Sequence, residues 1–481
     1  MKYMSRTLSL MLMCALILTG CGQSGTPSET TAAGDSAASD VTTDPNAPAV
    51  EPCDYGGKEF SIFASDSVQY DNYYFAEEQT GEAMNDAIFK RRMQVEDYLG
   101  VTLTQRLSEK NVLDFYGEVR EFVMAGDDAH QLILAHQFHG NSPMLGDGLL
   151  YDWNKLPSID LDKPYWNQLC NSNLELDGKL YFAVSDYMLS ESVAILFNKD
   201  LIEQFKMDDP YTLVRDGKWT LARLLSMASQ ATADLNGDTV MDMNDRYGVS
   251  GESGWRLNGF MYAGDVFLTE KDASGAMTLT INNERTVKLM ESLDRLINGS
   301  DDLFTWKINA KDQLKMDSGR VLFQFEGTAE LKNYRDTNVD FGLLPYPKLD
   351  DAQKQYYSME WSGLMALPKT IGDPEMVGKV MEMLSYYSGD TTQPAYFDIV
   401  LGEKLSRDAE SKEMLSYIFD NVVVDPGMNY FAAGTGMNQL FYTLFYGLQN
   451  GSATFASYYA QYEEKAHAEI ESLMETIRSL D

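Results

Sequence analysis

Cysteine and histidine are scarce in this chain of 481 residues, which contains four of each, and this scarcity limits the chemistry open to it. Cys14 and Cys21 lie in the N-terminal segment, so only Cys53 and Cys170 could pair in the body of the protein. Two thiols do not make a disulfide framework, and these two lack the close spacing of metal-binding cysteines. We therefore expect neither a disulfide-stabilised scaffold nor a cysteine-based metal site.

Positive charge is also scarce, because 38 Lys and Arg residues stand against 73 Asp and Glu residues. Without Lys2 and Arg6 of the N-terminal segment, which holds no acidic residue, the balance becomes 36 − 73 = −37. Such a chain repels the phosphate backbone, so nucleic acid is excluded as a partner. The acidity suits divalent cations and neutral ligands, and it disfavours anionic ones.

Long hydrophobic runs are missing as well. The longest apolar run covers residues 8–18, and its length of about 11 residues is too short for a bilayer core that needs roughly 20. Basic residues precede the run and small residues follow it, which is the layout of a secretory signal over residues 1–20. We therefore expect an exported protein without a membrane-spanning helix.

The end of this signal predicts a lipid anchor. Leu18-Thr19-Gly20-Cys21 resembles the bacterial lipobox, and Cys21 would become the lipidated N-terminus; the alternative is an ordinary signal with a chance cysteine. Residues 22–52 contain no Lys, Arg or aromatic residue and cannot bury enough surface to fold. We expect residues 21–54 to be a tether that holds the protein on the extracellular face of the cell membrane.

The remaining sequence alternates strand and helix patterns. Its beginning predicts the order βαβαβ, with strands at 58–65, 101–107 and 131–135 and helices at 85–99 and 112–124. This order is typical of a doubly wound α/β sheet. The pattern then restarts with strands near 180–184 and 192–197 and a helix over 221–233 capped by Thr220. The length fits two α/β lobes.

Several segments together resemble the extracellular solute-binding proteins of the sugar ABC importer class, the family 1 group that includes maltose-binding protein. Each segment alone is a weak signal, but their order and spacing over some 300 residues are specific to this family. The segments are Asn85-Asp86-Ala87-Ile88-Phe89-Lys90-Arg91-Arg92, Asp177-Gly178-Lys179-Leu180-Tyr181, Ile195-Leu196-Phe197-Asn198-Lys199, Gly319-Arg320-Val321-Leu322-Phe323, Leu344-Pro345-Tyr346-Pro347-Lys348 and Ser362-Gly363-Leu364-Met365-Ala366-Leu367-Pro368.

The resemblance implies a periplasmic-binding-protein-like fold of type II, with two doubly wound lobes joined by a hinge that the chain crosses several times. Lobe I would contain residues 55–187 and 342–364, and lobe II residues 188–341 and 365–481. The crossings would fall near 185–191, 341–345 and 361–368. The resemblance also implies a monomer whose partners are a carbohydrate and the membrane subunits of an ABC permease.

Ligands of open α/β sheets bind beyond the carboxyl ends of strands and between domains, so polar and aromatic residues at those places are candidates. Aromatic faces suit sugar rings, and carboxylates accept sugar hydroxyls. Core packing, helix capping and plain hydrogen bonding remain the alternatives for every candidate, and Trp153, Trp166 and Trp219 lie in structural contexts. The predicted ligand-binding residues are Asp66, His136, Tyr187, Trp255, Trp306, Glu326 and Trp361.

Residues 234–245 form the sharpest local motif. Oxygen-bearing side chains stand at loop positions 1, 3, 5, 9 and 12 of a calcium-binding spacing. Thr239 replaces the usual glycine, and the last position holds a shorter carboxylate, so an acidic turn is the alternative. The predicted ligands of a structural Ca²⁺ are Asp234, Asn236, Asp238, the Val240 carbonyl, Asp242 and Asp245.

The sequence contains no motif that fixes a catalytic pair, so we expect a binding protein and not an enzyme. A glycoside hydrolase would need two carboxylates across the scissile bond, and it remains the enzymatic alternative. A sensor lipoprotein that uses the same clamp without transport is the other alternative. The identity of the sugar, or of another neutral solute, does not follow from these residues.

Overall fold

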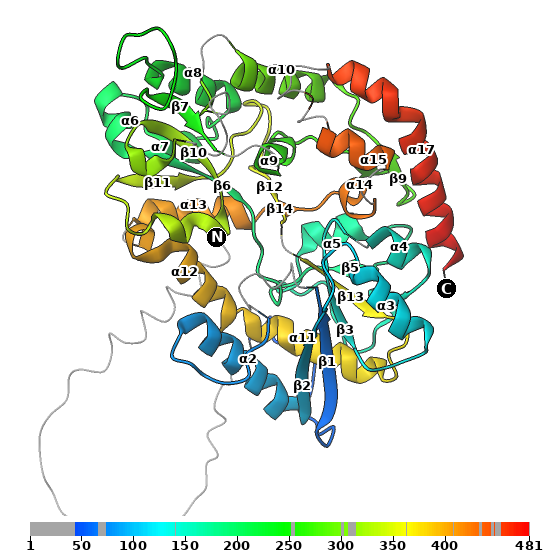
Figure 1. The fold of residues 1–481 in the computed structure, drawn as a ribbon. Helices are drawn as coiled ribbons and strands as arrows, with labels where there is room; N and C mark the ends of the chain where they lie inside the picture. The colour runs from blue at the N-terminus through cyan, green and yellow to red at the C-terminus, as the bar shows by residue number, and fades with distance from the viewer. Residues whose placement is uncertain are drawn as a thin grey trace, which may run out of the picture. The chain divides into compact units, whose positions relative to one another are not determined.

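The computed structural model describes most of residues 44–481 and organises them around two separate β-sheets (Figure 1). The residues outside this description are 1–43, 66–73, 140, 252–254, 300–302, 306–313, 362, 407, 432–434, 444–446, 448–453 and 481. The predicted signal, Cys21 and most of the predicted tether therefore lie outside the described residues. Residues 48–481 form one compact unit.

The first sheet defines lobe I, and its strand order is β2-β1-β3-β13-β4, with β5 also paired to β13. β1 pairs in parallel with both β2 and β3, as the predicted βαβαβ order requires, whereas β13 is antiparallel to β3. The strands are β1 (Lys58–Ala64), β2 (Val101–Leu107), β3 (Leu132–His136), β4 (Leu150–Tyr151), β5 (Phe182–Ala183) and β13 (Gly363–Pro368).

Helix α2 (Ala83–Leu99) connects β1 to β2 and shows how local sequence sets the element. The Glu82 carboxylate accepts the Asn85 N–H at its start. Gly100 ends the helix with φ 60°, a left-handed conformation that glycine adopts without strain. The buried residues of the helix include Met84, Ile88, Val95 and Leu99. Val95 and Leu99 belong to the main core with β1 and β2, whereas Met84 and Ile88 belong to a second buried cluster with Leu189 and residues of β6.

The second sheet defines lobe II and has the order β11-β6-β10-β7. β10 is parallel to β7 and antiparallel to β6. All residues of β6 and β10 are buried, which is the pattern of strands covered on both faces. The strands are β6 (Val193–Asn198), β7 (Tyr247–Ser250), β10 (Val321–Gly327) and β11 (Phe341–Leu344).

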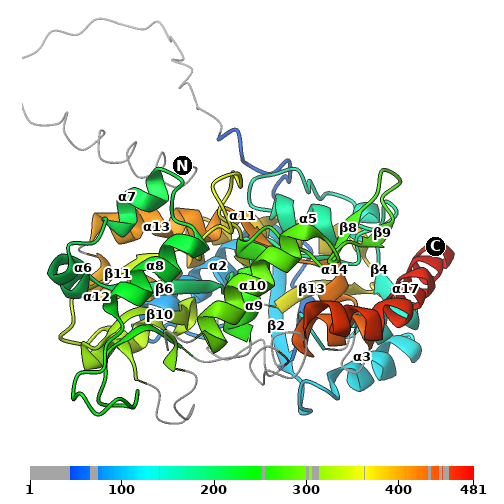
Figure 2. The ribbon, with the colours of Figure 1, turned by 90° about the horizontal axis from the view of Figure 1, so that it is seen from above.

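The remaining elements cover the two sheets and join them, and Figures 1 and 2 both show the sheets in different halves of this unit. The α-helices are α3 (Phe115–Met124), α4 (Asn141–Gly146), α5 (Gln168–Leu174), α6 (Lys199–Phe205), α7 (Pro210–Arg215), α8 (Leu221–Ala231), α9 (Trp255–Ala263), α10 (Glu284–Asn298), α11 (Pro374–Ser388), α12 (Thr392–Ser406), α13 (Ala409–Phe419), α14 (Pro426–Asn429), α15 (Gly436–Asn438) and α17 (Phe455–Ser479). The other elements are β8 (Thr269–Lys271), β9 (Met277–Leu279), β12 (Ser358–Met359), β14 (Val422–Val423), η2 (Trp153–Lys155), η5 (Met316–Ser318), η6 (Thr328–Tyr334) and η7 (Gln439–Thr443).

The sheet pairing corrects the predicted lobe boundaries. Residues 342–344 were assigned to lobe I, but they belong to β11 and pair with β6 in lobe II. Residues 365–368 were assigned to lobe II, but they belong to β13 and pair with lobe I. The predicted crossing near 341–345 was therefore wrong, because the chain passes from β11 to β13 between residues 344 and 363; the crossing predicted near 361–368 includes the start of β13. Sequence patterns identify strands but do not contain the partner of each strand.

The assignment of the C-terminal part to lobe II was also too simple. Glu382 on α11 accepts hydrogen bonds from Tyr165 and from Trp166 Nε1, both in lobe I. At the end of α17, the Ile477 carbonyl accepts a 2.9 Å hydrogen bond from Lys179 Nζ. Both α11 and the end of α17 thus contact lobe I, whereas α13 contacts β11 of lobe II.

Several smaller predictions concern single residues. Trp153, Trp166 and Trp219 are fully buried core residues, as predicted. Cys53 and Cys170 are both free thiols.

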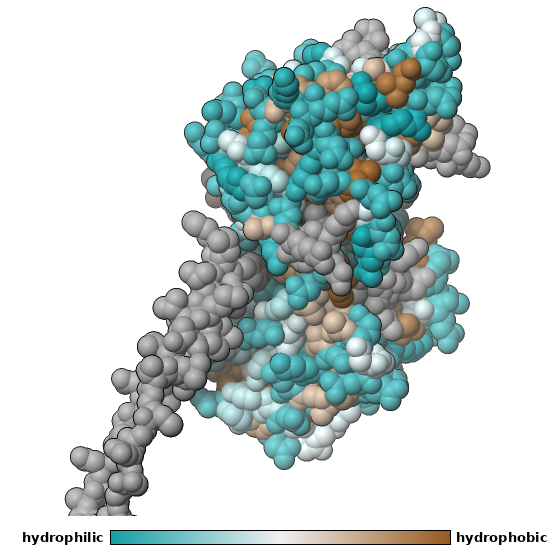
Figure 3. All heavy atoms as spheres, turned by 90° about the vertical axis from the view of Figure 1, so that its left-hand side faces the viewer, coloured by the Kyte–Doolittle hydropathy of each residue, from teal (hydrophilic) through white to brown (hydrophobic). Residues whose placement is uncertain are grey.

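No helix among the described residues combines the length and the apolar character that crossing a membrane requires. On the face that Figure 3 shows, hydrophilic residues predominate over the coloured part of the chain, in keeping with the acidic composition.

Candidate ligand-binding site

Residues 185–192 carry the chain from β5 of lobe I to β6 of lobe II, at the first crossing that the sequence predicted. Tyr187 in this segment is completely buried, so its predicted role as a ligand contact was wrong. The buried Arg91 guanidinium lies over its ring at 4.4 Å and donates hydrogen bonds to neutral oxygens of Tyr74, Ser388 and Thr392. Burial lowers the pKa of Arg91 to about 10. Tyr187 therefore anchors the hinge.

Aromatic and imidazole side chains gather on lobe I where β3 ends, and we call His136, Phe138, His139 and Trp361 the aromatic cluster. Ring centroids lie 4.7 Å apart between Phe138 and Trp361, and 4.8 Å apart between His136 and His139. Trp361 is half-buried, which leaves part of its indole exposed. His136 and Trp361 were both predicted as ligand contacts, and the structure brings them into one group.

The aromatic cluster holds its histidines neutral at ordinary pH. Burial lowers the pKa of His136 to about 3, and the neighbouring His139 adds to the effect. Burial also lowers the pKa of His139. His136 Nδ1 accepts a 3.1 Å hydrogen bond from the Phe138 N–H, so the loop after β3 fixes its ring. The cluster thus presents aromatic faces without a positive charge.

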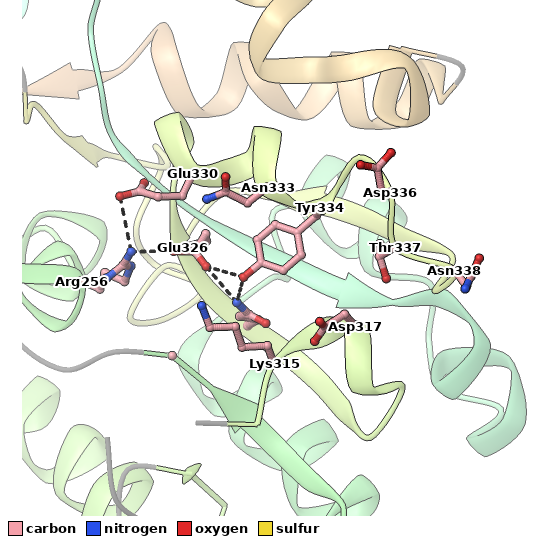
Figure 4. A pocket seen from close by; sticks show the side chains of 12 residues that line it. Arg256, Lys315, Asp317, Glu326, Glu330, Asn333, Tyr334, Asp336, Thr337 and Asn338 are labelled. Atoms are coloured by element: carbon pink, nitrogen blue, oxygen red, sulfur yellow. Dashed lines mark hydrogen bonds and ion pairs between the residues drawn. The ribbon is translucent and has the colours of Figure 1, made fainter. Parts of the chain in front are cut away.

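A pocket with a volume of about 650 Å³ lies on lobe II beside the end of β10 (Figure 4). Polar and charged side chains form most of its wall, and they come from β10, η6, α9, the segment before β10 and the segment after η6. The lining residues are Gly251, Arg256, Lys315, Asp317, Gln324, Glu326, Glu330, Asn333, Tyr334, Asp336, Thr337 and Asn338.

A buried network fixes the floor of this polar pocket. Arg256 Nη2 lies 2.6 Å from Glu326 Oε1, and both side chains are less than a tenth exposed. Glu326 Oε2 accepts hydrogen bonds of 2.8 Å from Gln324 Nε2 and 2.7 Å from the Tyr334 hydroxyl. Burial, followed by the charge of Glu326, raises the pKa of Tyr334. Because each group is held by a partner, the floor is preorganised.

The second carboxylate near Arg256 is held less tightly. Glu330 Oε1 lies 3.6 Å from Arg256 Nη2, and its side chain is 40% exposed. Figure 4 shows Glu330 and Asn333 on one side of the pocket, with Lys315 and Asp317 on another. The pocket therefore combines a fixed interior with a more accessible polar rim.

Both parts of the site are tied to consecutive residues of the hinge. The Trp361 N–H donates a 2.8 Å hydrogen bond to the Glu191 carbonyl. The Thr328 N–H, two residues beyond Glu326, donates a 2.8 Å hydrogen bond to the Ser192 carbonyl. The aromatic cluster of lobe I and the end of β10 in lobe II therefore meet at residues 191 and 192.

Three of the other predicted ligand contacts have side chains outside the described part of the chain. Asp66 and Trp306 lie outside the described residues, and the side chain of Trp255 is not described either, although Trp255 begins α9. Glu326 lines the pocket as predicted, but its carboxylate is already bound on both oxygens. These candidates stay predictions as ligand contacts.

Sequence reasoning missed Arg256, Gln324 and Tyr334. One signal for Gln324 was available, because Gln324 and Glu326 alternate with Phe323 and Phe325 in a buried strand and must share one face. A polar pair on a buried face needs partners, which predicts a hydrogen-bonded group there. Arg256 carried no such signal, since its partner lies 70 residues away in the chain.

The predicted calcium loop bends as its spacing requires. Thr239 adopts φ 68°, the left-handed conformation that a β-branched residue resists, and donates its N–H to Asp234 Oδ2 at 2.8 Å. Asp234 also accepts the Gly237 N–H at 2.6 Å, and hydrogen bonds of this kind lower its pKa. Asp245 is buried and accepts the Leu235 N–H at 2.8 Å.

These hydrogen bonds engage the carboxylates that would have to bind the ion. No group of three or more His, Cys, Asp or Glu side chains converges as a metal site within the part of the chain that the structure describes. Calcium binding stays a prediction.

The two sheets and the chain crossings between them define the fold of the type II periplasmic binding proteins, and solved structures of that fold match the chain. The predicted fold class is thus confirmed. No protein-family model matches the sequence, and no curated protein matches it either.

Three of the matching structures illustrate the similarity. A cyclic alpha-maltosyl-1,6-maltose binding protein from Arthrobacter globiformis is 13% identical with a TM-score of 0.57, and the match covers 87% of this chain and 100% of that one. M. tuberculosis UspC is 16% identical with a TM-score of 0.56, and the coverage is 85% and 99%. An ABC substrate-binding protein from Listeria monocytogenes, in complex with cycloalternan, is 14% identical with a TM-score of 0.51, covering 86% and 99%.

Proposed function

We propose that this protein is an extracellular solute-binding protein that captures a carbohydrate and delivers it to an ABC permease. The observation that carries the proposal is the joining of two chemically different surfaces at residues 191 and 192 of the hinge. One surface is the aromatic cluster and the other is the polar pocket. A ligand that has apolar ring faces and many hydroxyls needs both.

Each surface supplies one part of carbohydrate recognition. The exposed part of Trp361 can stack on the C–H face of a sugar ring, with Phe138 behind it at 4.7 Å. The polar pocket offers carboxylate, amide and hydroxyl groups to sugar hydroxyls, and its 650 Å³ volume lies in the usual range for small-molecule sites. The solved structures of this fold named above include proteins that bind cyclic oligosaccharides.

The hinge supports a clamp that closes on its ligand. A ligand that contacts both lobes stabilises a closed arrangement, and a few hinge residues absorb the backbone change. Tyr187 and Arg91 hold one end of the first crossing in place, so the change is expected at residues 188–192. The buried contacts of Arg91 keep lobe I and the start of α12 together.

A thermal-shift screen of the protein against mono- and oligosaccharides tests the proposal. A ligand present at 100 times its dissociation constant raises the free energy of unfolding by about 2.7 kcal/mol, which is readily detected. We expect at least one oligosaccharide to do so and to make the protein more compact in small-angle scattering. If no sugar shifts the melting temperature, the carbohydrate proposal is rejected. Release of a cleaved sugar would favour the hydrolase alternative instead.

The anchoring of the protein is a separate part of the proposal, and it rests on the lipobox-like residues 18–21. We expect Cys21 to carry the lipid that holds the protein on the outer face of the cell membrane. In Cys21→Ala, a metabolically incorporated fatty acid should be lost and the protein should move from the membrane fraction to the medium. Label retained in the variant would reject Cys21 as the anchor.

Transport and sensing use the same clamp, so a cellular measurement must separate them. Uptake of the radiolabelled sugar found in the screen should fall when the gene is deleted. It should recover when the wild-type protein is restored, if the protein serves a permease. Unchanged uptake together with a lost transcriptional response to the sugar would favour a sensor lipoprotein.

A further inference from the structure

The polar pocket has an unequal charge balance that points to the class of sugar it accepts. Among the lining residues that the structure describes, four carry carboxylates, Asp317, Glu326, Glu330 and Asp336, and two carry cationic groups, Arg256 and Lys315. The formal sum is 2 − 4 = −2. A ligand in this pocket therefore meets a surplus of negative charge.

The buried cation does not offset this surplus for a ligand. Arg256 Nη2 lies 2.6 Å from Glu326 and 3.6 Å from Glu330, so its charge is balanced by two carboxylates of the protein. Its side chain is only 6% exposed, and an incoming anion would have to displace one of these partners. Displacing Glu326 would also break its hydrogen bonds from Gln324 and Tyr334.

The accessible charges on the rim are mainly negative. Glu330 is 40% exposed on its side chain, and Asp317 and Asp336 are exposed as well. Lys315 is the exposed cation of the lining. Charges beyond about 8 to 10 Å are screened at physiological ionic strength, so these neighbours decide the field inside the pocket. The net charge of −35 on the whole chain has the same sign and adds no compensation.

We propose that the pocket selects amino sugars over neutral sugars and rejects acidic sugars such as hexuronates. This inference rests on the proposed function, because it assumes that a carbohydrate occupies the polar pocket. A ligand ammonium group is attracted to Glu330 and to the rim aspartates, whereas a ligand carboxylate is repelled by them. At separations of about 4 to 6 Å, such an interaction changes affinity by about tenfold or more.

The test is a set of calorimetric titrations with sugars matched in shape and different in charge. The gluco, galacto and manno series each supply a hexose, a 2-amino-hexose and a hexuronate. The β-1,4-linked trimers of glucose, glucosamine and glucuronate give the same comparison at oligosaccharide length. We expect affinity to fall in the order amino sugar, neutral sugar, acidic sugar. The gap, meaning the ratio of the dissociation constants of the acidic and the amino sugar, should be at least about tenfold. The gap should narrow as salt is raised.

Variants on the rim separate charge from shape. Glu330→Gln combined with Asp336→Asn removes two negative charges at exposed positions, and the gap between amino and acidic sugars should shrink to about threefold or less. Lys315→Gln is the matched control, because it removes a positive charge from the same pocket and should widen the gap. Unchanged melting temperatures would show that the variants remain folded.

The outcomes distinguish a failure of the charge selection from a failure of the proposed function. A hexuronate that binds tightest, or an affinity ratio that the rim variants leave unchanged, overturns the charge selection while the carbohydrate proposal stands. If no member of any series binds and the wider sugar screen also finds no ligand, the proposed function itself fails.

Discussion

The two surfaces that meet at the hinge differ in almost every physical respect. The aromatic cluster of lobe I consists of rings packed against one another, and its histidines are kept neutral by burial. The polar pocket of lobe II is lined by charged and amide side chains around a buried ion pair. The aromatic cluster can bind a ligand by covering its apolar area. The polar pocket can select between ligands, because a misplaced polar group of the ligand stays unpaired there.

The two surfaces therefore tolerate changes in their side chains and ligands to different degrees. Stacking surfaces accept rings of several kinds, since every sugar ring has an apolar face. A preorganised ion pair with fixed hydrogen-bond partners accepts few changes, because each removal leaves another buried group without its partner. Substitutions in the buried ion pair should therefore change stability, whereas substitutions of partly exposed side chains on either surface should mainly change affinity.

The largest effect is expected from the buried ion pair. Arg256→Met leaves the Glu326 carboxylate buried without its cation, and should lower the free energy of unfolding by about 3–5 kcal/mol. The double variant Arg256→Met with Glu326→Leu removes both charges and should recover part of the loss, because Gln324 and Tyr334 still lose their shared acceptor. Denaturant unfolding of the single and double variants measures this. A double variant as unstable as the single one would contradict the role of charge burial.

The aromatic cluster should show the opposite behaviour. Trp361→Ala removes the stacking face and should weaken the best sugar at least about thirtyfold, corresponding to roughly 2 kcal/mol of binding energy. Its stability should fall less than that of Arg256→Met, because Trp361 is only partly buried, although it packs against the main core. Trp361→Phe is the matched control and should keep most of the affinity. Unchanged affinity in the alanine variant would move the site away from Trp361.

The neutral histidine of the cluster predicts a pH dependence of stability. The folded pKa of His136 is about 3, below its ordinary value of 6.5, so the unfolded chain takes up a proton first as pH falls. Stability is therefore lost on acidification from about pH 6.5 toward pH 3, by up to about 1.4 kcal/mol per pH unit. Urea unfolding of wild type and of His136→Gln between pH 7 and pH 4 isolates this contribution. Equal slopes in the two proteins would contradict it.

The smallest effect on ligand binding is expected from the loop 234–245, which contributes to neither surface. If the loop binds calcium, its dissociation constant should be submillimolar to micromolar, and sugar affinity should be unchanged by the ion. Calorimetry on chelator-treated protein checks this, with Asp234→Ala as the variant that should lose the signal. The absence of a calcium heat in the wild type would leave an acidic turn, in which Asp234 serves the Gly237 and Thr239 amides.

Helices whose pattern and capping residues lie close together in the sequence were predicted well. The predicted helix at 85–99 is α2, which covers Ala83–Leu99, and Thr220 caps α8 as expected. The lobe membership of β11 and β13 was not predictable in this way. Both are short apolar strands, and their partners are chosen by packing across distant parts of the chain.

The site was predictable only in part, for a related reason. His136 ends a strand of lobe I and Trp361 precedes one at a crossing, so their positions could be inferred from the order of elements. Tyr187 met the same criterion, but Arg91 and Tyr74 enclose it, and neither contact leaves a trace near residue 187 in the sequence. The pair of Arg256 and Glu326 likewise depends on the fold that brings α9 to β10.

The place of β13 in the first sheet has a consequence for how the protein is made. Gly363 pairs with His136 although 363 − 136 = 227 residues separate them, so β3 has this neighbour only after most of the chain has emerged. Until then its polar backbone groups form an open edge to which other chains can add. Contacts between such distant residues also slow folding. Synthesis from the N-terminus therefore creates an interval in which the unfinished sheet must be kept from aggregating, and a fragment that stops before residue 363 should not fold by itself.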